Sequence, residues 1–323
     1  MTANIWGVIL IWAIAIVAFV LFNILISYLI ISYILFVLHL KRRGKNRWTR
    51  DCSSDDPNQL KMYDEGRKWS ERYAENKQDL HIVNEGLNMY AEFYDLHSDR
   101  AVIIIPGRTE GLRYGYYFAK PYTDNGYSVL TIDQRAHGES DGKYNTLGFD
   151  EHRDIIAWIK VLKENYEIKS VLLHGICIGG ACGLYAITSK SCPDCVDGLV
   201  VEGMFQRFFE SFKNHMIELN KPVNPCIHFV DMWIKLITGH SMKVGPINVI
   251  DKMKKPLLLL HSKEDKYSLP HMAQELFDKC ASEKKQIVFF DHGAHSMLRI
   301  TDTEKYDSSI TAFIHENFPE IKV

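Results

Sequence analysis

Hydrophobic positions form one long, continuous block near the start of the chain. From Ile5 to Leu38 no side chain is charged, and Ile, Leu, Val, Phe and Ala predominate. A straight helix over this block would be about 51 Å long, compared with about 30 Å for the hydrocarbon core of a bilayer. We therefore predict one tilted or overlong transmembrane helix within residues 1–40. A hairpin that breaks near Asn23 is the alternative, although it would leave two short spans without a loop.

The hydrophobic block ends in a basic cluster, whereas its short N-terminal flank has no basic side chain. The cluster comprises Lys41, Arg42, Arg43, Lys45, Arg47 and Arg50. The positive-inside rule then predicts a single-pass protein of the cell membrane with the C-terminal domain in the cytoplasm. We also expect the cluster to contact anionic lipid head groups. Residues 41–78 are predicted to form a basic juxtamembrane linker and a helix that lead into the domain.

Beyond residue 78, short apolar runs alternate with amphipathic segments. The predicted strands are His81–Val83, Leu87–Tyr94, Val102–Ile105, Ser128–Ile132, Ser170–Leu173, Gly198–Val201, Pro256–Leu260 and Gln286–Phe290. The predicted helices cover about 113–125, 147–164, 178–190, 270–281 and 302–316. Continuous apolar strands between amphipathic helices favour a mostly parallel sheet covered on both faces. We therefore predict an α/β domain over residues 79–323.

One interval, residues 206–253, separates two predicted strands by more than a usual connection. Two helical faces in it are apolar: Phe208, Phe212 and Met216 form one, and Phe229, Trp233 and Ile237 the other. We interpret this interval as a small helical lid. Its apolar faces could cover the sheet, contact a substrate, or do both.

Charge and cysteine content narrow the classes of function. All 40 acidic residues lie after Arg50, together with 32 of the 38 basic ones, so residues 51–323 carry a net charge of −8. Binding nucleic acid through a broad basic face requires clustered Lys and Arg, so we expect no nucleic-acid partner. Seven cysteines without framework spacing suit a reducing compartment.

A candidate nucleophile follows the strand predicted at Ser170–Leu173. The sequence Gly175-Ile176-Cys177-Ile178-Gly179-Gly180 has the pattern G-x-nucleophile-x-G and then continues into a helix. Small neighbours are needed because a sharp strand-to-helix turn brings the residues on either side of the nucleophile close together. Cys177 occupies the position where serine is usual.

A nucleophile of this kind needs a histidine base and a carboxylate that orients it. Asp265 and His295 each lie just past the end of a predicted strand, where open α/β sheets place their active sites. Glu264 and His292 are the competing choices, and loop position favours Asp265 and His295. For the oxyanion, the backbone N–H groups of Ile178 and Arg108 are the candidate donors.

Taken together, these motifs resemble those of a known family. They comprise Pro106–Glu110, Asp133–Gly142, Leu147-Gly148-Phe149, Gly175–Gly180, Asp265 and Gly293-Ala294-His295. The chain is similar to α/β-hydrolases of the serine aminopeptidase and monoglyceride-lipase-like group, and most similar to bacterial members with an N-terminal membrane anchor. The resemblance implies the α/β-hydrolase fold, the acid at 265, the histidine at 295 and oxyanion donors at 108 and 178. In this group the D-x-R-x-x-G-x-S-x-G segment, here Asp133–Gly142, is structural and shapes the loop beside the site.

The sequence departs from the group's pattern at two positions. Pro106-Gly107 replaces the usual His-Gly, which leaves the backbone role intact, and Cys177 replaces serine. Cysteine at this turn resembles dienelactone hydrolases and bile-acid-CoA type acyltransferases. We expect a membrane-anchored hydrolase that cleaves an ester, thioester or amide of a lipid-like acyl group through an acyl-enzyme, without cofactor or metal. An acyltransferase with the same triad and a non-catalytic binding protein are the alternatives.

Overall fold

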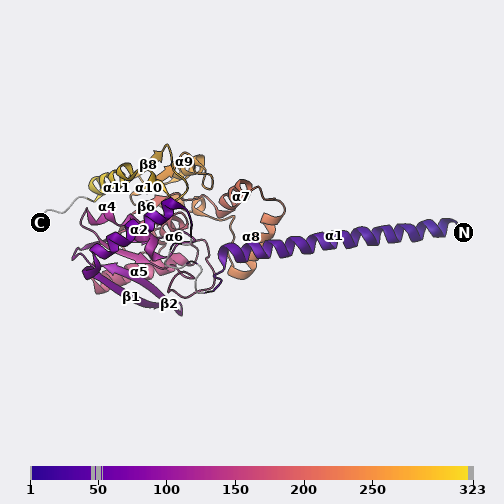
Figure 1. Cartoon of the computed structure of the whole chain (residues 1–323), viewed down its shortest axis with the longest axis horizontal. Helices are drawn as coiled ribbons and strands as arrows, with labels where there is room; N and C mark the ends of the chain where they lie inside the picture. Colours follow the sequence, from indigo (N-terminus) through magenta and orange to yellow (C-terminus); the bar gives the residue numbers. More distant parts are fainter. Residues whose placement is uncertain (1, 45–47, 49–51, 53, 319–323) are drawn as a thin grey trace.

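The computed structural model describes residues 2–44, 48, 52 and 54–318. Three basic side chains of the predicted cluster, Lys45, Arg47 and Arg50, lie outside the described residues. Figure 1 shows an α/β domain from which one long helix projects, with the two chain termini at opposite ends of the molecule. The predicted fold class is therefore confirmed.

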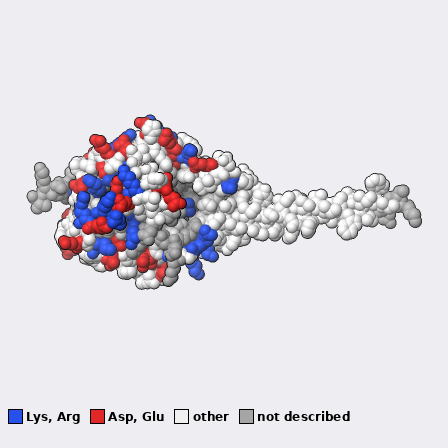
Figure 2. Space-filling model, in the orientation of Figure 1, with Lys and Arg blue, Asp and Glu red and all other residues white. Residues whose placement is uncertain are grey.

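The projecting helix is α1 (Thr2–Leu40), which runs without a break. Two of its polar side chains form hydrogen bonds within the helix: the Asn23 amide donates to the carbonyl oxygen of Phe19 at 2.7 Å, and the Ser27 hydroxyl donates to that of Asn23 at 2.8 Å. Figure 2 shows the helix without charged side chains along its projecting length, whereas charges of both signs cover the domain. Among the described residues, α1 is thus the single helix long and apolar enough to cross a membrane, and it forms no hairpin.

The core of the domain is an eight-stranded sheet in the order β1-β2-β4-β3-β5-β6-β7-β8. Its strands are β1 (Lys77–Asn84), β2 (Leu87–Tyr94), β3 (Arg100–Ile105), β4 (Ser128–Ile132), β5 (Ser170–Ile176), β6 (Val196–Glu202), β7 (Leu257–Ser262) and β8 (Lys285–Phe290). The β1–β2 and β2–β4 pairs are antiparallel, and the other pairs are parallel. The central strands are buried on both faces, which explains their continuous apolar sequences.

Helices cover both faces of the sheet. They are α2 (Pro57–Arg72), α3 (Leu112–Gly115), α4 (Lys120–Thr123), α5 (Glu151–Asn165), α6 (Ile178–Ile187), α9 (Pro270–Lys279), α10 (Leu298–Thr301) and α11 (Thr303–Asn317). One hydrophobic cluster contains Trp158 of α5 and Leu184 of α6. The other contains Trp69 of α2 and Tyr306 of α11. The two clusters are the two sides of the covered sheet, as the strand pattern predicted.

Two predicted helices differ in extent from the observed ones. The segment predicted at 113–125 is divided into α3, the 3-10 turn η2 (Tyr116–Phe118) and α4. The helix predicted at 147–164 begins only at Glu151, whose carboxylate accepts hydrogen bonds from the backbone N–H groups of Thr146 and Gly148. Gly148 has φ +94°, outside the helical region, so the preceding segment forms a turn.

The insertion between β6 and β7 holds α7 (Phe208–Glu218), α8 (Cys226–Thr238), η3 (Pro246–Asn248) and η4 (Ile250–Lys252). In Figure 1, α7 and α8 lie at the base of α1. Trp233 of α8 donates its indole N–H to the Ser32 hydroxyl at 3.1 Å, and its ring packs edge-on against Tyr33 of α1. One of the two predicted apolar faces is therefore turned toward the projecting helix.

Candidate active site

Cys177 stands between β5 and α6 in a backbone conformation that L-residues rarely adopt. Its φ is +53° and its ψ is −112°. A Cβ at Gly175 would overlap the backbone of Gly179, and a Cβ at Gly179 would overlap the carbonyl oxygen of Ile105. The close approach of these backbones explains why glycine flanks the cysteine two residues away on each side. The turn directs the sulfur into a cavity at the carboxyl end of the sheet.

Asp265 and His295 meet beside the same cavity. Nδ1 of His295 lies 2.7 Å from Oδ2 of Asp265. The other oxygen of Asp265 accepts hydrogen bonds of 2.8 Å from the backbone N–H groups of Tyr267 and Ser268. The carboxylate is 2% exposed, so these bonds hold it in one orientation. The structure thus brings the preferred acid and the preferred histidine together.

The charges in this cluster set the protonation of its members. Burial raises the pKa of Asp265, but the neighbouring His295 outweighs burial and lowers the pKa below its usual value. For His295, burial lowers the pKa, whereas the charges of Cys177 and Asp265 and hydrogen bonds with both raise the pKa well above its usual value. The arrangement therefore favours a protonated imidazole, the form that can transfer a proton to a leaving group.

Glu264 and His292, the competing choices, pair with each other instead. Nδ1 of His292 lies 3.1 Å from Oε1 of Glu264, and the two side chains are 79% and 57% exposed. Neither lines the cavity that contains Cys177. Asp265 and His295 therefore face the inside of the domain, whereas Glu264 and His292 face solvent. Each alternative lies only one or three residues away along the same loop, but its side chain points outward.

The two candidate oxyanion donors, Ile178 and Arg108, come from different parts of the chain. Ile178 is the first residue of α6, so its N–H has no partner from within the helix. Arg108 follows β3 and borders the cavity. Its carbonyl oxygen lies 2.6 Å from Nε2 of His137, and this contact fixes the position of the loop that follows β3.

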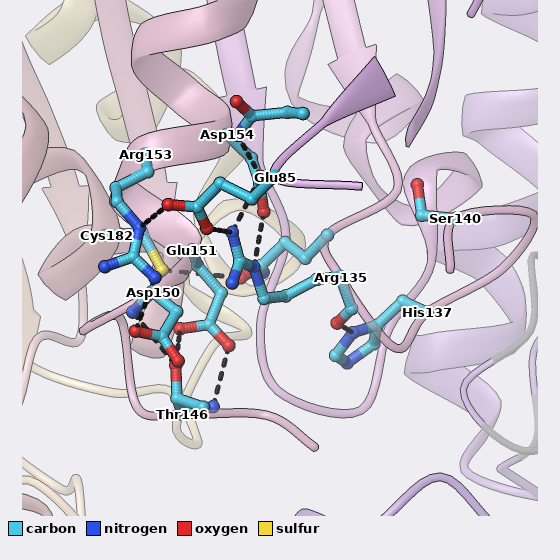
Figure 3. A network of polar contacts seen from close by, with 12 residues as sticks. Glu85, Arg135, His137, Ser140, Thr146, Asp150, Glu151, Arg153, Asp154 and Cys182 are labelled. Atoms are coloured by element: carbon cyan, nitrogen blue, oxygen red, sulfur yellow. Dashed lines mark hydrogen bonds and ion pairs between the residues drawn. The ribbon is translucent and has the colours of Figure 1, made fainter. Parts of the chain in front are cut away.

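His137 belongs to the loop that follows β4, and this loop is held by a network of polar contacts (Figure 3). Arg135 makes two hydrogen bonds to the carboxylate of Asp154, of 2.7 and 2.9 Å, and a third to Glu85. Nδ1 of His137 lies 2.9 Å from the carbonyl oxygen of Arg135. The network therefore connects α5 to the backbone at Arg108. The sequence motif indicated this loop, but the contact of His137 with Arg108 is visible only in the structure.

The cavity itself has a volume of about 370 Å³ and is bordered by both predicted and unpredicted residues. The apolar part of its lining includes Phe205, Phe208, Phe212 and Met297. Three further lining residues were not anticipated: His39 from the last turn of α1, His215 from α7 and Tyr267. No local pattern marks them, because they come from three separate parts of the chain. Among the residues that the structure describes, no group of three His, Cys, Asp or Glu side chains could hold a metal ion.

Comparison with protein families agrees with this fold. A family model described as "alpha/beta hydrolase fold" matches residues 100–222, and one described as "Serine aminopeptidase, S33" matches residues 247–303. The chain belongs to the α/β-hydrolase superfamily. An esterase of Pyrococcus furiosus has the same fold, with a TM-score of 0.64 and 21% identity over 84% of this chain and 99% of that one.

Curated relatives also include membrane-associated and lipase proteins by name. The uncharacterized protein YqkD of Bacillus subtilis is 29% identical over 66% of this chain and 70% of its own length. The lysophosphatidylserine lipase ABHD12 of Danio rerio is 23% identical over 60% of this chain, and the alignment spans 51% of that protein. A protein of Saccharomyces cerevisiae described as an uncharacterized membrane protein is 25% identical over 56% of this chain.

Proposed function

We propose that this protein is a membrane-anchored hydrolase that cleaves an ester, thioester or amide of an apolar acyl group. The proposal assigns Cys177 as nucleophile, His295 as acid and base, and Asp265 as the carboxylate that orients the histidine. One observation carries it: Cys177 and His295 border a single cavity lined by phenylalanine side chains, and His295 is paired with the buried carboxylate of Asp265. The fold and the esterase and lipase relatives support the coarser class of hydrolase.

In the proposed reaction, the sulfur of Cys177 attacks the acyl carbonyl, and the carbonyl oxygen becomes an oxyanion. The N–H groups of Arg108 and Ile178 stabilise this charge. The imidazolium of His295 then protonates the leaving oxygen, nitrogen or sulfur as its bond to the acyl carbon breaks. A water molecule, deprotonated by His295, hydrolyses the resulting thioester and releases the carboxylic acid. Asp265 keeps the proton on Nδ1 throughout, so that Nε2 faces the reacting atoms.

The membrane is the proposed source of the substrate. His39, at the end of the apolar helix α1, lines the same cavity as Cys177, so the cavity lies next to the point where the helix enters the domain. We propose that residues 206–253 act as a lid over it and that Phe208 and Phe212 contact the acyl chain. The lipase name of the zebrafish relative supports a lipid-like substrate.

For the orientation, we propose a cytoplasmic domain, because a cluster of basic residues directly follows the helix. Of these basic side chains, Arg42 donates to the carbonyl oxygens of Ser140 and Gly138 and thereby ties the chain to the domain. Arg43 is exposed. We propose that Arg43 rather than Arg42 contacts anionic head groups.

Acyl transfer is the second candidate, and the cysteine favours it. A thioester is open to attack by amines as well as by water, so an amine substrate in the cavity would receive the acyl group. Hydrolysis and acyl transfer share the same acyl-enzyme. They differ only in the second substrate, which is water in hydrolysis and an amine in acyl transfer.

Labelling and turnover of the detergent-solubilised full-length protein test the proposal. A thiol-directed acyl probe should label the wild type, and Cys177→Ala should lose both the label and turnover of octanoyl esters and thioesters. Cys192→Ala, which changes a half-buried thiol outside the cavity, is the matched control and should keep both. Adding amine acceptors to the panel separates acyl transfer from hydrolysis. Equal labelling of several cysteines, or a strong preference for acetyl over octanoyl esters, would contradict the proposal.

A further inference from the structure

The side chain of Arg108 has no role in the reaction described above, although it lies in the same cavity. One of its terminal nitrogens, Nη1, donates to the carbonyl oxygen of His39 at 2.8 Å. Throughout the part of the chain that the structure describes, no carboxylate lies within 4.0 Å of this guanidinium. An arginine carries five N–H donors, and hydrogen-bond partners for the others are absent among the residues that the structure describes, while the residue itself lines the cavity.

Nearby charges do not neutralise this guanidinium by direct contact. The carboxylate of Glu110 accepts hydrogen bonds from the hydroxyl and the backbone N–H of Thr109, at 2.7 and 3.2 Å. Burial lowers the pKa of Arg108, while the charges of Cys177 and Glu110 act in the opposite direction. Arg108 is half-buried, and a cation that is partly removed from water without a directly bonded counter-ion is destabilised, so a bound anion would offset that cost.

The lining of the cavity is divided by chemistry. Phe208 and Phe212 of α7 contribute to its apolar part, whereas its polar groups include Arg108, Glu110, His39 and His215. The rings of His39 and His215 lie 6.1 Å apart and that of Phe212 lies 5.0 Å from His39, so the polar and apolar parts are continuous. Such a cavity fits an amphiphilic molecule with an acyl chain at one end and a hydrogen-bond acceptor at the other.

We propose that the Arg108 guanidinium is a binding subsite for an anionic oxygen group of the substrate, so that the preferred substrates are acyl lipids that carry a phosphate near the scissile bond. Arginine matches phosphate because its planar fork donates two parallel hydrogen bonds. The backbone N–H of the same residue is the proposed oxyanion donor. The phosphate must therefore lie no farther from the scissile carbonyl than the length of one arginine side chain. This inference rests on the proposed function.

Two ether lipids test the subsite without any catalysis. The probes are 1-O-octylglycerol 3-phosphate and neutral 1-O-octylglycerol, titrated calorimetrically below their micelle concentrations into full-length Cys177→Ala protein in detergent. The phosphate probe should bind at least tenfold more tightly than the neutral one, and adding Arg108→Gln should remove most of this difference. Inorganic phosphate alone should compete weakly, because it lacks the chain that occupies the apolar part.

The matching kinetic test uses octanoyl esters of glycerol 3-phosphate and of glycerol. Arg108→Gln should lower the ratio of kcat/KM for the phosphate ester to that for the neutral ester by about tenfold or more, mainly through KM, and Arg108→Lys should recover part of the ratio. Lys213→Gln removes an exposed positive charge on α7 outside the cavity and should leave the ratio unchanged.

The outcomes separate this inference from the proposed function. Equal losses for both esters in Arg108→Gln, or equal binding of both ether probes, would overturn the subsite and leave the hydrolase intact. If the phosphate probe bound tightly and in an Arg108-dependent way but the wild type showed no turnover, the proposed hydrolase function would be overturned. The proposed binding subsite would then be retained. A change of ratio in Lys213→Gln equal to that in Arg108→Gln would indicate general charge attraction and overturn the subsite.

Discussion

Cys177 and its neighbours show how much depends on single residues. A left-handed backbone at a residue with a side chain costs about 1–3 kcal/mol, and the surrounding contacts must hold it in place. Here the N–H of Cys177 donates to the carbonyl oxygen of Glu202 at 2.8 Å, and its carbonyl oxygen accepts from Gly180 at 3.1 Å. The backbone of the turn is therefore fixed on both sides, which points the sulfur away from the sheet and into the cavity.

At the same scale, the two neighbouring acids Asp265 and Glu264 give a direct prediction. Asp265→Asn should leave a folded protein whose turnover falls by about 10²–10⁴, because an amide stabilises the wrong tautomer of His295. His295→Ala should remove nearly all turnover. Glu264→Gln should change turnover little, because Glu264 bonds to His292 at the surface.

Steady-state rates on one octanoyl thioester, with circular dichroism as the check on folding, provide the measurement. If Glu264→Gln were the more damaging of the two acid changes, the assignment of the acid would be wrong.

At the scale of elements, α1 is more than a membrane anchor in this structure. Its last turn lines the cavity through His39, and the carbonyl oxygen of His39 accepts a hydrogen bond from Arg108. Farther back along the helix, Tyr28 stacks on Phe229 of α8 with ring centroids 6.4 Å apart. The helix therefore contacts both the loop after β3, which holds Arg108, and the insertion that borders the cavity, so its position affects the shape of the cavity.

Two truncations test this coupling. Deleting residues 1–27 removes the part of α1 that projects beyond Tyr28 and should leave turnover of a short soluble ester in detergent nearly unchanged. Deleting residues 1–40 also removes His39 and the surface that packs on Trp233, and should reduce turnover by on the order of 10²-fold, because small displacements of catalytic groups have effects of this size.

Both truncated proteins are compared by turnover and by thermal midpoint in the same detergent. Equal turnover of the two would mean that α1 acts only as an anchor.

At the scale of the whole molecule, polar groups buried beneath the site link the sheet to its covering helices. His174 of β5 lies 3.1 Å from the Tyr306 hydroxyl of α11, which donates to Glu202 of β6 at 2.8 Å. Glu202 also accepts the backbone N–H of Leu298 at 2.9 Å. Burial raises the pKa of Glu202. The network thus joins two central strands to the helices that follow the His295 loop.

His174 makes the stability of the fold depend on pH. Burial, and then the charge of Arg299, lowers the pKa of His174 to about 3, whereas in the unfolded chain it is about 6.5. As the pH falls below 6.5, His174 becomes protonated in the unfolded chain but stays neutral in the folded protein. The free energy of unfolding therefore decreases, with a slope of at most about 1.4 kcal/mol per pH unit down to pH 3. His174→Gln should remove this part of the slope.

The measurement compares the thermal midpoints of wild type and His174→Gln between pH 7 and pH 4.5. Glu202 is present in both proteins, so the difference between the two curves reports the histidine. Parallel curves would show that His174 accepts its proton in the folded state.

Much of this protein was determined by local sequence. The length of the apolar block requires a long helix, the alternation of apolar runs and amphipathic segments requires a covered parallel sheet, and the glycines around Cys177 mark a turn where backbones nearly touch. Asp265 and His295 were identifiable because each follows a strand, and the carboxyl ends of parallel strands share one edge. Period, spacing and backbone sterics act over a few residues, so a sequence displays them directly.

Tertiary structure alone decided which distant residues meet in the cavity. His39 and Arg108 are 69 residues apart, and Ser32 and Trp233 are 201 residues apart, yet each pair is hydrogen-bonded. Such contacts arise from the packing of whole elements, and packing is set by the combined shape of many side chains, which no local pattern records.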